Sequence, residues 1–221
     1  MAFTLATGSQ VFCARAYGAP KNMTAVTKAT EAVATLEAGH GITAGTYIEV
    51  TSGWGKLNQR IVRVKAVATN DVTLEGIDTN GSSFTAGGGV GTVRAITAWT
   101  EVTQVKDLSS SGGDLQMADA TSISDVVERK IPTVRSAVTM NLTVYDDPSL
   151  AWYADVTVAS DSATPYGLKM VLANGSRLVA NSYWSLNKVP SVTKNEVLTT
   201  QLSLAYAADP VRYAAKHANE T

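Results

Sequence analysis

The stretch IPTVRSAVTMNLTVYDD, residues 131–147, alternates apolar and polar side chains along most of its length. In an extended chain, one face would carry Val134, Val138, Met140, Leu142 and Val144. The opposite face would carry Thr133, Arg135, Ala137, Thr139, Asn141 and Thr143. Only Ser136 interrupts the alternation, so the pattern predicts one strand of about fifteen residues with a single buried face.

Such a strand would be too long for a small domain. At roughly 3.3 Å per residue it would run about 50 Å, two or three times the length of an ordinary strand. Its outer part must then pair with something beyond its own domain. We therefore interpret the chain as a self-assembling structural protein.

Composition limits the fold class and the possible partners. The chain has 221 residues, enough for one large or two small domains, and its 17 glycines and scarce helical patterns favour an all-β architecture. The net charge is -1 and the isoelectric point is about 6.1, so there is no global basic field to hold nucleic acid tightly.

Secretion, membrane insertion and a disulfide framework are not expected. Cys13 is the single cysteine, and we predict that it is a small buried hydrophobe. The first residues, MAFTLATGSQVF, lack a charged n-region and a continuous apolar h-region, and no apolar run could span a bilayer. We expect synthesis in the cytoplasm.

Residues 27–97 contain short alternating segments separated by glycine turns, which predict a compact β-barrel or small sandwich. The predicted strands are Ala32–Leu36, Tyr47–Thr51, Arg60–Ala68, Val72–Glu75 and Thr92–Ile96. The runs at 40–50, 57–60 and 72–78 resemble a small β module of phage structural proteins. That module is similar to the first catalytic-cysteine half-domain insert of ubiquitin-activating enzymes.

The flanking parts show longer elements. Extended segments are predicted at Ser9–Ala16 and Ala98–Leu108, and the glycine- and serine-rich stretch Ser109–Ala120 has too little apolar surface to order itself. Asp147 and Pro148 predict the start of a helix of about three turns. Its apolar spacing is carried by Leu150, Tyr153, Ala154 and Val158.

The carboxyl-terminal part is predicted to close with a hairpin and a last strand. Asn174-Gly175 is the strongest hairpin signal in the chain, and a strand ending at Tyr206 follows the break at Pro190. From Asp209 onward we expect a polar, mobile tail.

This order of elements, with Leu168–Trp184 and Val192–Tyr206 as the closing strands, resembles the major tail tube protein of long-tailed, non-contractile (siphovirus) phages. The resemblance implies a mainly β, tail-tube-type sandwich or barrel with one packed helix and a long hairpin, interrupted by a small inserted β-barrel. The core domain would be residues 1–26 plus 98–221, and the outer module residues 27–97.

The same resemblance implies a virion tail protein, made in the cytoplasm of a bacterial host, that stacks as hexameric rings around a DNA channel. Tape measure and tail-end proteins would be its partners, DNA would pass transiently without specific binding, and no membrane is involved. The lumen or intersubunit residues would be Glu101, Thr103, Lys106, Asp107, Thr133, Arg135, Thr139, Asn141 and Thr143. The ring-stacking loop would be Ser109, Ser110, Ser111, Gly112, Gly113, Asp114, Leu115, Gln116 and Met117.

Charge is consistent with such a channel. The part from Trp99 onward has 10 Lys+Arg and 13 Asp+Glu, a net charge of -3, whereas residues 25–98 balance at 6 and 6. An acidic core would repel the phosphates of DNA rather than bind them.

No catalytic, cofactor-binding or metal-binding residues are expected. The two histidines, His40 and His217, lie in a turn and a tail, and the glycine run at 86–91 lacks the ending of a phosphate loop. Asp146 and Asp147 would point to opposite faces of a strand. The four tryptophans are scattered, which favours core or interface anchors over a sugar site.

Three other interpretations remain open at this stage. A phage baseplate, decoration or other surface carbohydrate-binding protein would show a concave aromatic site and a closed oligomer. A hydrolase would join His40 to a nucleophile in one cleft. In a monomeric sandwich, the polar face of residues 133–143 would simply be solvated.

Overall fold

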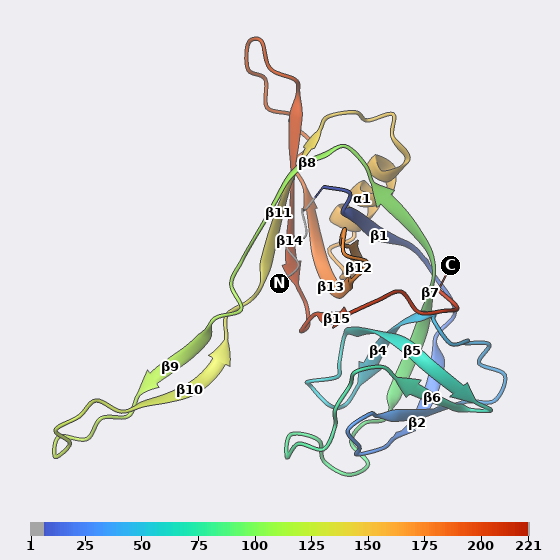
Figure 1. Ribbon diagram of the computed structural model, residues 1–221, viewed down its shortest axis with the longest axis vertical. Coiled ribbons are helices and arrows are strands. Elements are labelled where there is room, and N and C mark those ends of the chain that lie inside the picture. The colour runs from blue at the N-terminus through green and yellow to red at the C-terminus, as the bar shows by residue number, and fades with distance from the viewer. Residues whose placement is uncertain (1–6, 221) are drawn as a thin grey trace.

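The computed structural model describes residues 7–220 and contains fifteen strands and one helix, α1 (Ala151–Asp161) (Figure 1). Residues 1–6 of the amino-terminal stretch lie outside this range. In chain order the strands are β1 (Gln10–Tyr17), β2 (Lys21–Val26), β3 (Val33–Leu36), β4 (Tyr47–Ser52), β5 (Arg60–Ala68), β6 (Asp71–Leu74), β7 (Gly91–Val102), β8 (Val105–Ser111), β9 (Leu115–Asp119), β10 (Lys130–Arg135), β11 (Thr139–Tyr145), β12 (Tyr166–Val171), β13 (Arg177–Leu186), β14 (Thr199–Tyr206) and β15 (Val211–Tyr213).

Six strands form a small closed barrel. They pair in the order β2-β3-β6-β5-β4-β7, and β2 pairs again with β7 to complete the circle. Alternating apolar residues of the central strands fill the inside, including Ile48, Val50, Val62, Val64 and Leu74, all with 0% exposure. The sequence did not predict β2, because Met23 is the one buried residue of that strand.

A second, larger sheet follows the order β7-β1-β12-β13-β14-β11-β8. One face of this sheet packs with α1 around a separate core that includes Cys13, Leu142, Leu168 and Leu202. Strand β7 belongs to both units, since Val93 pairs with β4 and Trp99 pairs with β1. The barrel and the sheet therefore share one uninterrupted strand (Figure 1).

The prediction of a single strand at Ala98–Leu108 was wrong. Strand β7 ends at Val102 and β8 begins at Val105, because Gln104 adopts a left-handed backbone with φ of 60°. The chain thereby leaves the pairing with β1 and enters a pairing with β11.

The prediction of a single long strand at residues 131–147 was also wrong. It is divided into β10 and β11 at Ser136–Val138, the place where the apolar alternation is interrupted. Strand β11 buries Met140, Leu142 and Val144, pairs on both sides and is an ordinary core strand. Within residues 7–220, strand β10 pairs only with β9 and all of its residues are exposed, so its other edge and its apolar side chains are left uncovered in a single subunit.

A helix after Asp147 is confirmed, but it begins at Ala151 rather than at Pro148. The Asp147 carboxylate accepts hydrogen bonds from the Ser149 amide (3.0 Å) and hydroxyl (2.6 Å), and it forms a separate turn there instead of a helix cap. The buried residues of the helix are Trp152, Val156 and Ala159, whereas Val158, predicted to face inward, is 59% exposed.

The closing hairpin is confirmed. Strands β12 and β13 pair in register from Tyr166–Ser182 to Val171–Arg177, and Gly175 in the turn has φ of 81°. Leu198, just before β14, is 41% exposed.

The mobile polar tail predicted from Asp209 onward is instead ordered and packed against the rest of the fold. Residues Val211–Tyr213 form β15 on β13, and Tyr213 is buried in the barrel core. The Tyr213 hydroxyl accepts a hydrogen bond from the Arg63 backbone amide at 2.7 Å. The sequence pattern missed this because β15 is ordered by residues far away along the chain, among them Arg63, 150 residues from Tyr213.

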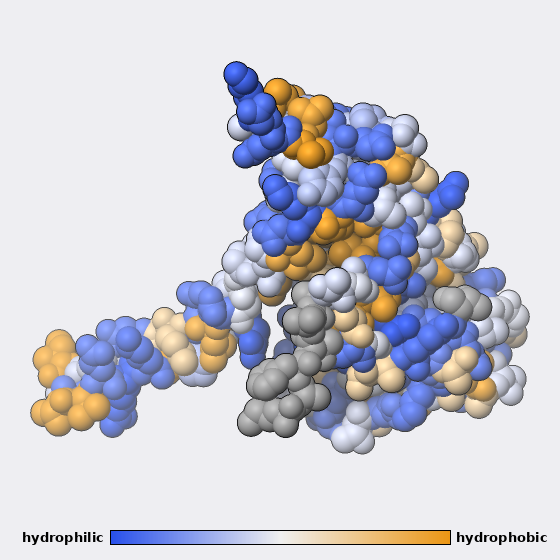
Figure 2. All heavy atoms as spheres, turned by 45° about the horizontal axis from the view of Figure 1, so that its top comes forward, coloured by the Kyte–Doolittle hydropathy of each residue, from blue (hydrophilic) through white to orange (hydrophobic). Residues whose placement is uncertain are grey.

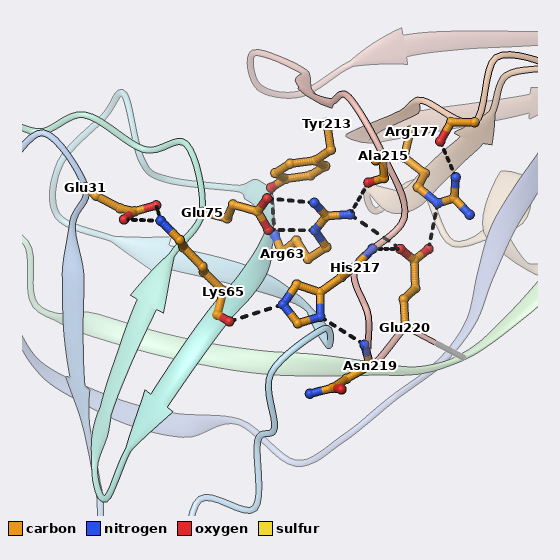
Figure 3. A network of polar contacts seen from close by, with 11 residues as sticks. Glu31, Arg63, Lys65, Glu75, Arg177, Tyr213, Ala215, His217, Asn219 and Glu220 are labelled. Carbon is orange, nitrogen blue, oxygen red and sulfur yellow. Dashed lines mark hydrogen bonds and ion pairs between the residues drawn. The ribbon is translucent and has the colours of Figure 1, made fainter.

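Further along the tail, the Glu220 carboxylate bridges two arginines from different units (Figure 3). Arg63 of β5 donates to it at 3.4 Å, and Arg177 of β13 donates at 3.1 Å. Arg63 also makes a bidentate pair with Glu75 at 2.6 and 2.7 Å. The Glu220 side chain is only 5% exposed, so the tail ties the barrel to the sheet through buried charge pairs.

Candidate assembly interface

A two-stranded arm, residues 113–135, projects from the sheet (Figure 1). It consists of β9, β10 and the tip between them, residues 120–129. The arm continues the β8–β11 pairing, because Ser111 pairs with Thr139 and the Gly113 amide donates to the Ser136 carbonyl at 3.2 Å. The two strand pairs therefore form one long ribbon with an irregularity in the middle.

Gly112 sits at that irregularity and permits it. Its φ is +87°, and a Cβ at this position would lie 2.0 Å from the Ala137 carbonyl oxygen. A residue with a side chain would have to push the two strands apart here. Opposite it, the Ser136 hydroxyl accepts a hydrogen bond from the Asp114 amide at 3.0 Å. Glycine and serine together thus define where the ribbon turns away from the core.

The arm carries apolar side chains but has no core of its own. Every residue of β9 and β10 is exposed. Its large apolar residues, with their exposed fractions, are Leu115 (44%), Met117 (54%), Ile123 (108%), Val126 (100%), Val127 (72%), Ile131 (57%) and Val134 (70%). Figure 2 shows apolar side chains gathered at the far end of the arm. An isolated two-stranded hairpin is marginal in water, and exposed apolar surface of this kind marks a contact site.

The outer face of the sheet presents rows of mostly polar side chains across neighbouring strands, with Ala205 and Tyr183 as the exceptions. The cross-strand rows are Asp107–Thr143–Gln201, Ser109–Asn141–Ser203–Ser185 and Ser111–Thr139–Ala205–Tyr183. Within them, Ser203 donates to Asn141 at 2.8 Å and Gln201 donates to Thr143 at 3.0 Å. Asp107 is the one carboxylate in these rows, so the face is polar and almost uncharged.

Strand β8 forms an open edge of this face. It pairs with β11 on one side and has no strand on the other within residues 7–220. An unpaired edge exposes backbone donors and acceptors to another chain. The barrel differs in this respect, because the β2–β7 pairing closes its circle of strands.

The residues predicted for the lumen or subunit contact lie in three places. Asp107, Thr139, Asn141 and Thr143 come together on the polar sheet face, and exposed Lys106 lies beside them on β8. Thr133 and Arg135 lie on the arm. Glu101 and Thr103 lie apart at the end of β7, where the side-chain Nε2 of Gln10 donates to the Glu101 carboxylate at 3.0 Å. Sequence reasoning missed Ser185, Gln201 and Ser203, whose alternation on β13 and β14 was the available signal.

The residues predicted as a stacking loop form strands instead. Ser109, Ser110 and Ser111 end β8, Gly112, Gly113 and Asp114 make the irregularity, and Leu115, Gln116 and Met117 begin β9. The stretch was expected not to order itself alone, and it is backbone pairing with residues 130–141 that makes it extended despite its polar composition. The irregular segment is the tip, residues 120–129, which has no distinctive sequence pattern.

The side chains that could react or bind a metal are buried or already hydrogen bonded. Cys13 is fully buried, and burial, with a further contribution from the charge of Asp155, raises the pKa of its thiol to about 12. His40 and His217 each bind backbone groups of their own turns. Over residues 7–220 no cluster of metal-ligating side chains occurs, and no helix there is long and apolar enough to cross a membrane.

The family of the chain follows from a match over most of its length. Residues 52–215 match the family model described as phage tail tube protein, TTP. The chain belongs to the phage tail tube protein family. It is therefore a structural protein of the virion tail that polymerises into a tube, and the family is not enzymatic.

Solved structures similar to this tail tube protein are distant in sequence. One is the tail of an empty GTA particle refined with C6 symmetry, with 8% identity, 52% of this chain and 87% of that chain covered, and a TM-score of 0.43. The virion of a native gene transfer agent has 9% identity, with 52% of this chain and 89% of that chain covered and a TM-score of 0.42. The baseplate of the anti-feeding prophage has 12% identity, with 55% of this chain and 88% of that chain covered and a TM-score of 0.40. No curated protein matches the chain.

Amide exchange should distinguish the arm in the free tail tube protein from the arm in the tube. We expect fast exchange in residues 113–135 of the monomer, because both faces of the hairpin meet water. In the tube these amides should slow by at least about tenfold, while those of β12 and β13, already within the sheet, should change little. Equal protection of the arm in both states would contradict the prediction.

Proposed function

We propose that this tail tube protein forms rings whose inner wall is the polar face of β8, β11, β14 and β13, and that the arm holds successive rings together. The observation that carries this proposal is the arm, a hairpin with apolar side chains and no core. The open edge of β8 supports a second contact, in which strand pairing between neighbours continues the sheet around the ring. The family resemblance implies hexameric rings.

The chemistry of the polar face supports its assignment to the lumen. A polyanion slides past a wall most easily when the wall neither binds nor concentrates phosphate. Hydroxyl and amide groups dominate the rows, and they bond to each other, as in the 2.9 Å contact between Ser111 and Thr139. Of the acidic residues counted from Trp99 onward, only Asp107 lies in these rows. The wall would therefore avoid binding DNA because it is nearly uncharged, and not because it is negatively charged.

The two units of the fold support a division of labour. We infer that residues 1–26 plus 98–221 form the tube wall, apart from β2 (Lys21–Val26), which completes the barrel, and that residues 27–97 contribute the rest of an outer module. A closed barrel offers no strand edge to a neighbour, which fits a position outside the wall. A deletion of residues 27–97 would leave β2 without its partner β3 and without the barrel part of β7, because β2 lies before residue 27 and pairs with both.

Other components of the tail follow from the same proposal. A tube of defined length needs a tape measure protein and proteins at its two ends, and the tube would pass DNA transiently during ejection. Neither contact with those proteins nor the passage of DNA requires a specific nucleic-acid site, which agrees with the net charge of -1.

Electron microscopy of the concentrated, purified protein tests the proposal. We expect hollow tubes, and a gold-maleimide label on Asn141→Cys should appear inside them, because Asn141 is exposed on the polar face and the natural Cys13 is buried. Label density on the outer surface would contradict the lumen assignment. A closed oligomer that never extends would contradict the tube and favour a baseplate or decoration protein.

A further inference from the structure

The arm and an apolar groove lie toward opposite ends of the same strand. The arm follows Ser111, the last residue of β8. The groove lies beside Val105–Leu108, the first residues of β8. A contact between the two regions would therefore join the far end of one copy to the near end of another. Such a head-to-tail contact leaves a free arm and a free groove at the ends and can repeat without limit.

The groove has a volume of about 310 Å³ and a mostly apolar floor. Its lining consists of Ser9, Val11, Val105, Lys106, Asp107, Leu108, Met170 and Leu172. Val105, Leu108 and Leu172 are partly exposed there, at the margin of the sheet core. The exposed rim residues are Ser9, Lys106 and Asp107, so an apolar floor is bordered by polar groups, as in a typical contact site.

The tip of the arm has matching chemistry. Ile123, Val126 and Val127 are 108%, 100% and 72% exposed, and they are compact enough to enter a groove of this size. Among the described residues, neither Glu128 of the tip nor Lys106 of the rim has an ion-pair partner. Their opposite charges allow a pair across the contact, and such a pair would fix its orientation.

We propose that the arm tip of one copy seats Ile123, Val126 and Val127 in the groove formed by β1, β8 and β12 of a second copy. This rests on the proposed function, in which copies stack through the arm, and it names the surface that receives the arm. A second copy is the favoured occupant because the chain carries both halves of the contact and the family polymerises. A bilayer is a poorer fit, since the tip carries Asp125 and Glu128 against the single cation Arg129.

Two variants that each disable one half test the proposal. The tip variant combines Val126→Asp and Val127→Asp, and the groove variant is Ser9→Trp, which fills the groove from its exposed rim. Each alone should lose tube formation by at least about tenfold. Val90→Asp and Ser82→Trp, at exposed barrel positions, are the matched controls and should form normal tubes. Mixing the two disabled variants should produce complexes of unlike copies that stop short of tubes, measured by light scattering.

Cross-linking gives a second measurement that does not depend on the disabling substitutions. Val126→Cys protein mixed with Ser9→Cys protein and oxidised should form a disulfide-linked dimer, and Val126→Cys mixed with Val90→Cys should not. Cys13 is buried and does not compete. A tip variant that forms tubes at the wild-type yield would overturn this inference alone, as would equal cross-linking to Ser9→Cys and Val90→Cys. Wild-type protein that forms no tubes would overturn the proposed function as well.

Discussion

Replacing residues 114–135 with an Asn-Gly turn should give a folded subunit that no longer forms tubes. Gly113 and Ser136 are already hydrogen bonded to each other, so a two-residue turn can close the β8–β11 ribbon at this point. The thermal midpoint should change by no more than about 2 °C, because every residue of β9 and β10 is exposed and contributes nothing to the core.

The loss of assembly should be large. Burying the three apolar tip residues would stabilise each contact between copies by about 4 kcal/mol, which corresponds to roughly a thousandfold in affinity. Sedimentation and electron microscopy would measure the tube yield at a fixed protein concentration. Ser124→Ala, which alters the same tip without changing its apolar residues, should form normal tubes. Tubes of normal length from the shortened protein would show that the arm does not hold the rings together.

The second large effect concerns stability. Glu220→Gln should lower the free energy of unfolding by about 3 kcal/mol, because it leaves Arg63 and Arg177 without the negative charge they share inside the protein. The thermal midpoint should fall by roughly 6–12 °C. Glu196→Gln removes the same charge at an exposed position and should have no measurable effect.

The pH dependence gives this prediction a second, independent measurement. Burial alone would raise the pKa of Glu220, but the hydrogen bonds from Arg177 and from the His217 amide, with the charge of Arg177, hold it below 4.5. The carboxylate therefore stabilises the fold above that pH, and this contribution is lost as the pH falls through the depressed pKa. Glu220→Gln should flatten the acid limb of the stability curve below about pH 4.5. An unchanged acid limb would show that the bridge contributes nothing.

Local patterns predicted the elements that depend on neighbouring residues. The strand at Arg60–Ala68 and the turn at Asn174-Gly175 appear where alternation and turn chemistry place them. The division of the long strand also had a local signal, because Ser136 breaks the alternation at the position where the ribbon turns. The turn of the ribbon also requires Gly112 on the opposite strand, and sequence spacing does not show which residues face each other.

Elements that depend on distant partners could not be predicted. Strand β15 is ordered by β13 and by the backbone of Arg63, and nothing in residues 209–220 distinguishes it from a solvated tail. The same limit applies to the candidate interface. Thr139, Asn141 and Thr143 were selected by alternation, whereas the groove combines residues near 9, 105 and 170 that only the folded chain brings together.

The shared strand β7 gives the molecule a mechanical property. Its twelve residues run without a break from the barrel into the sheet, and a strand of that length spans roughly 40 Å. A pull on the barrel from outside would load the β1–β7 and β4–β7 hydrogen bonds in shear rather than open a hinge. Anything that grips the outer barrel would thus strain the tube wall itself.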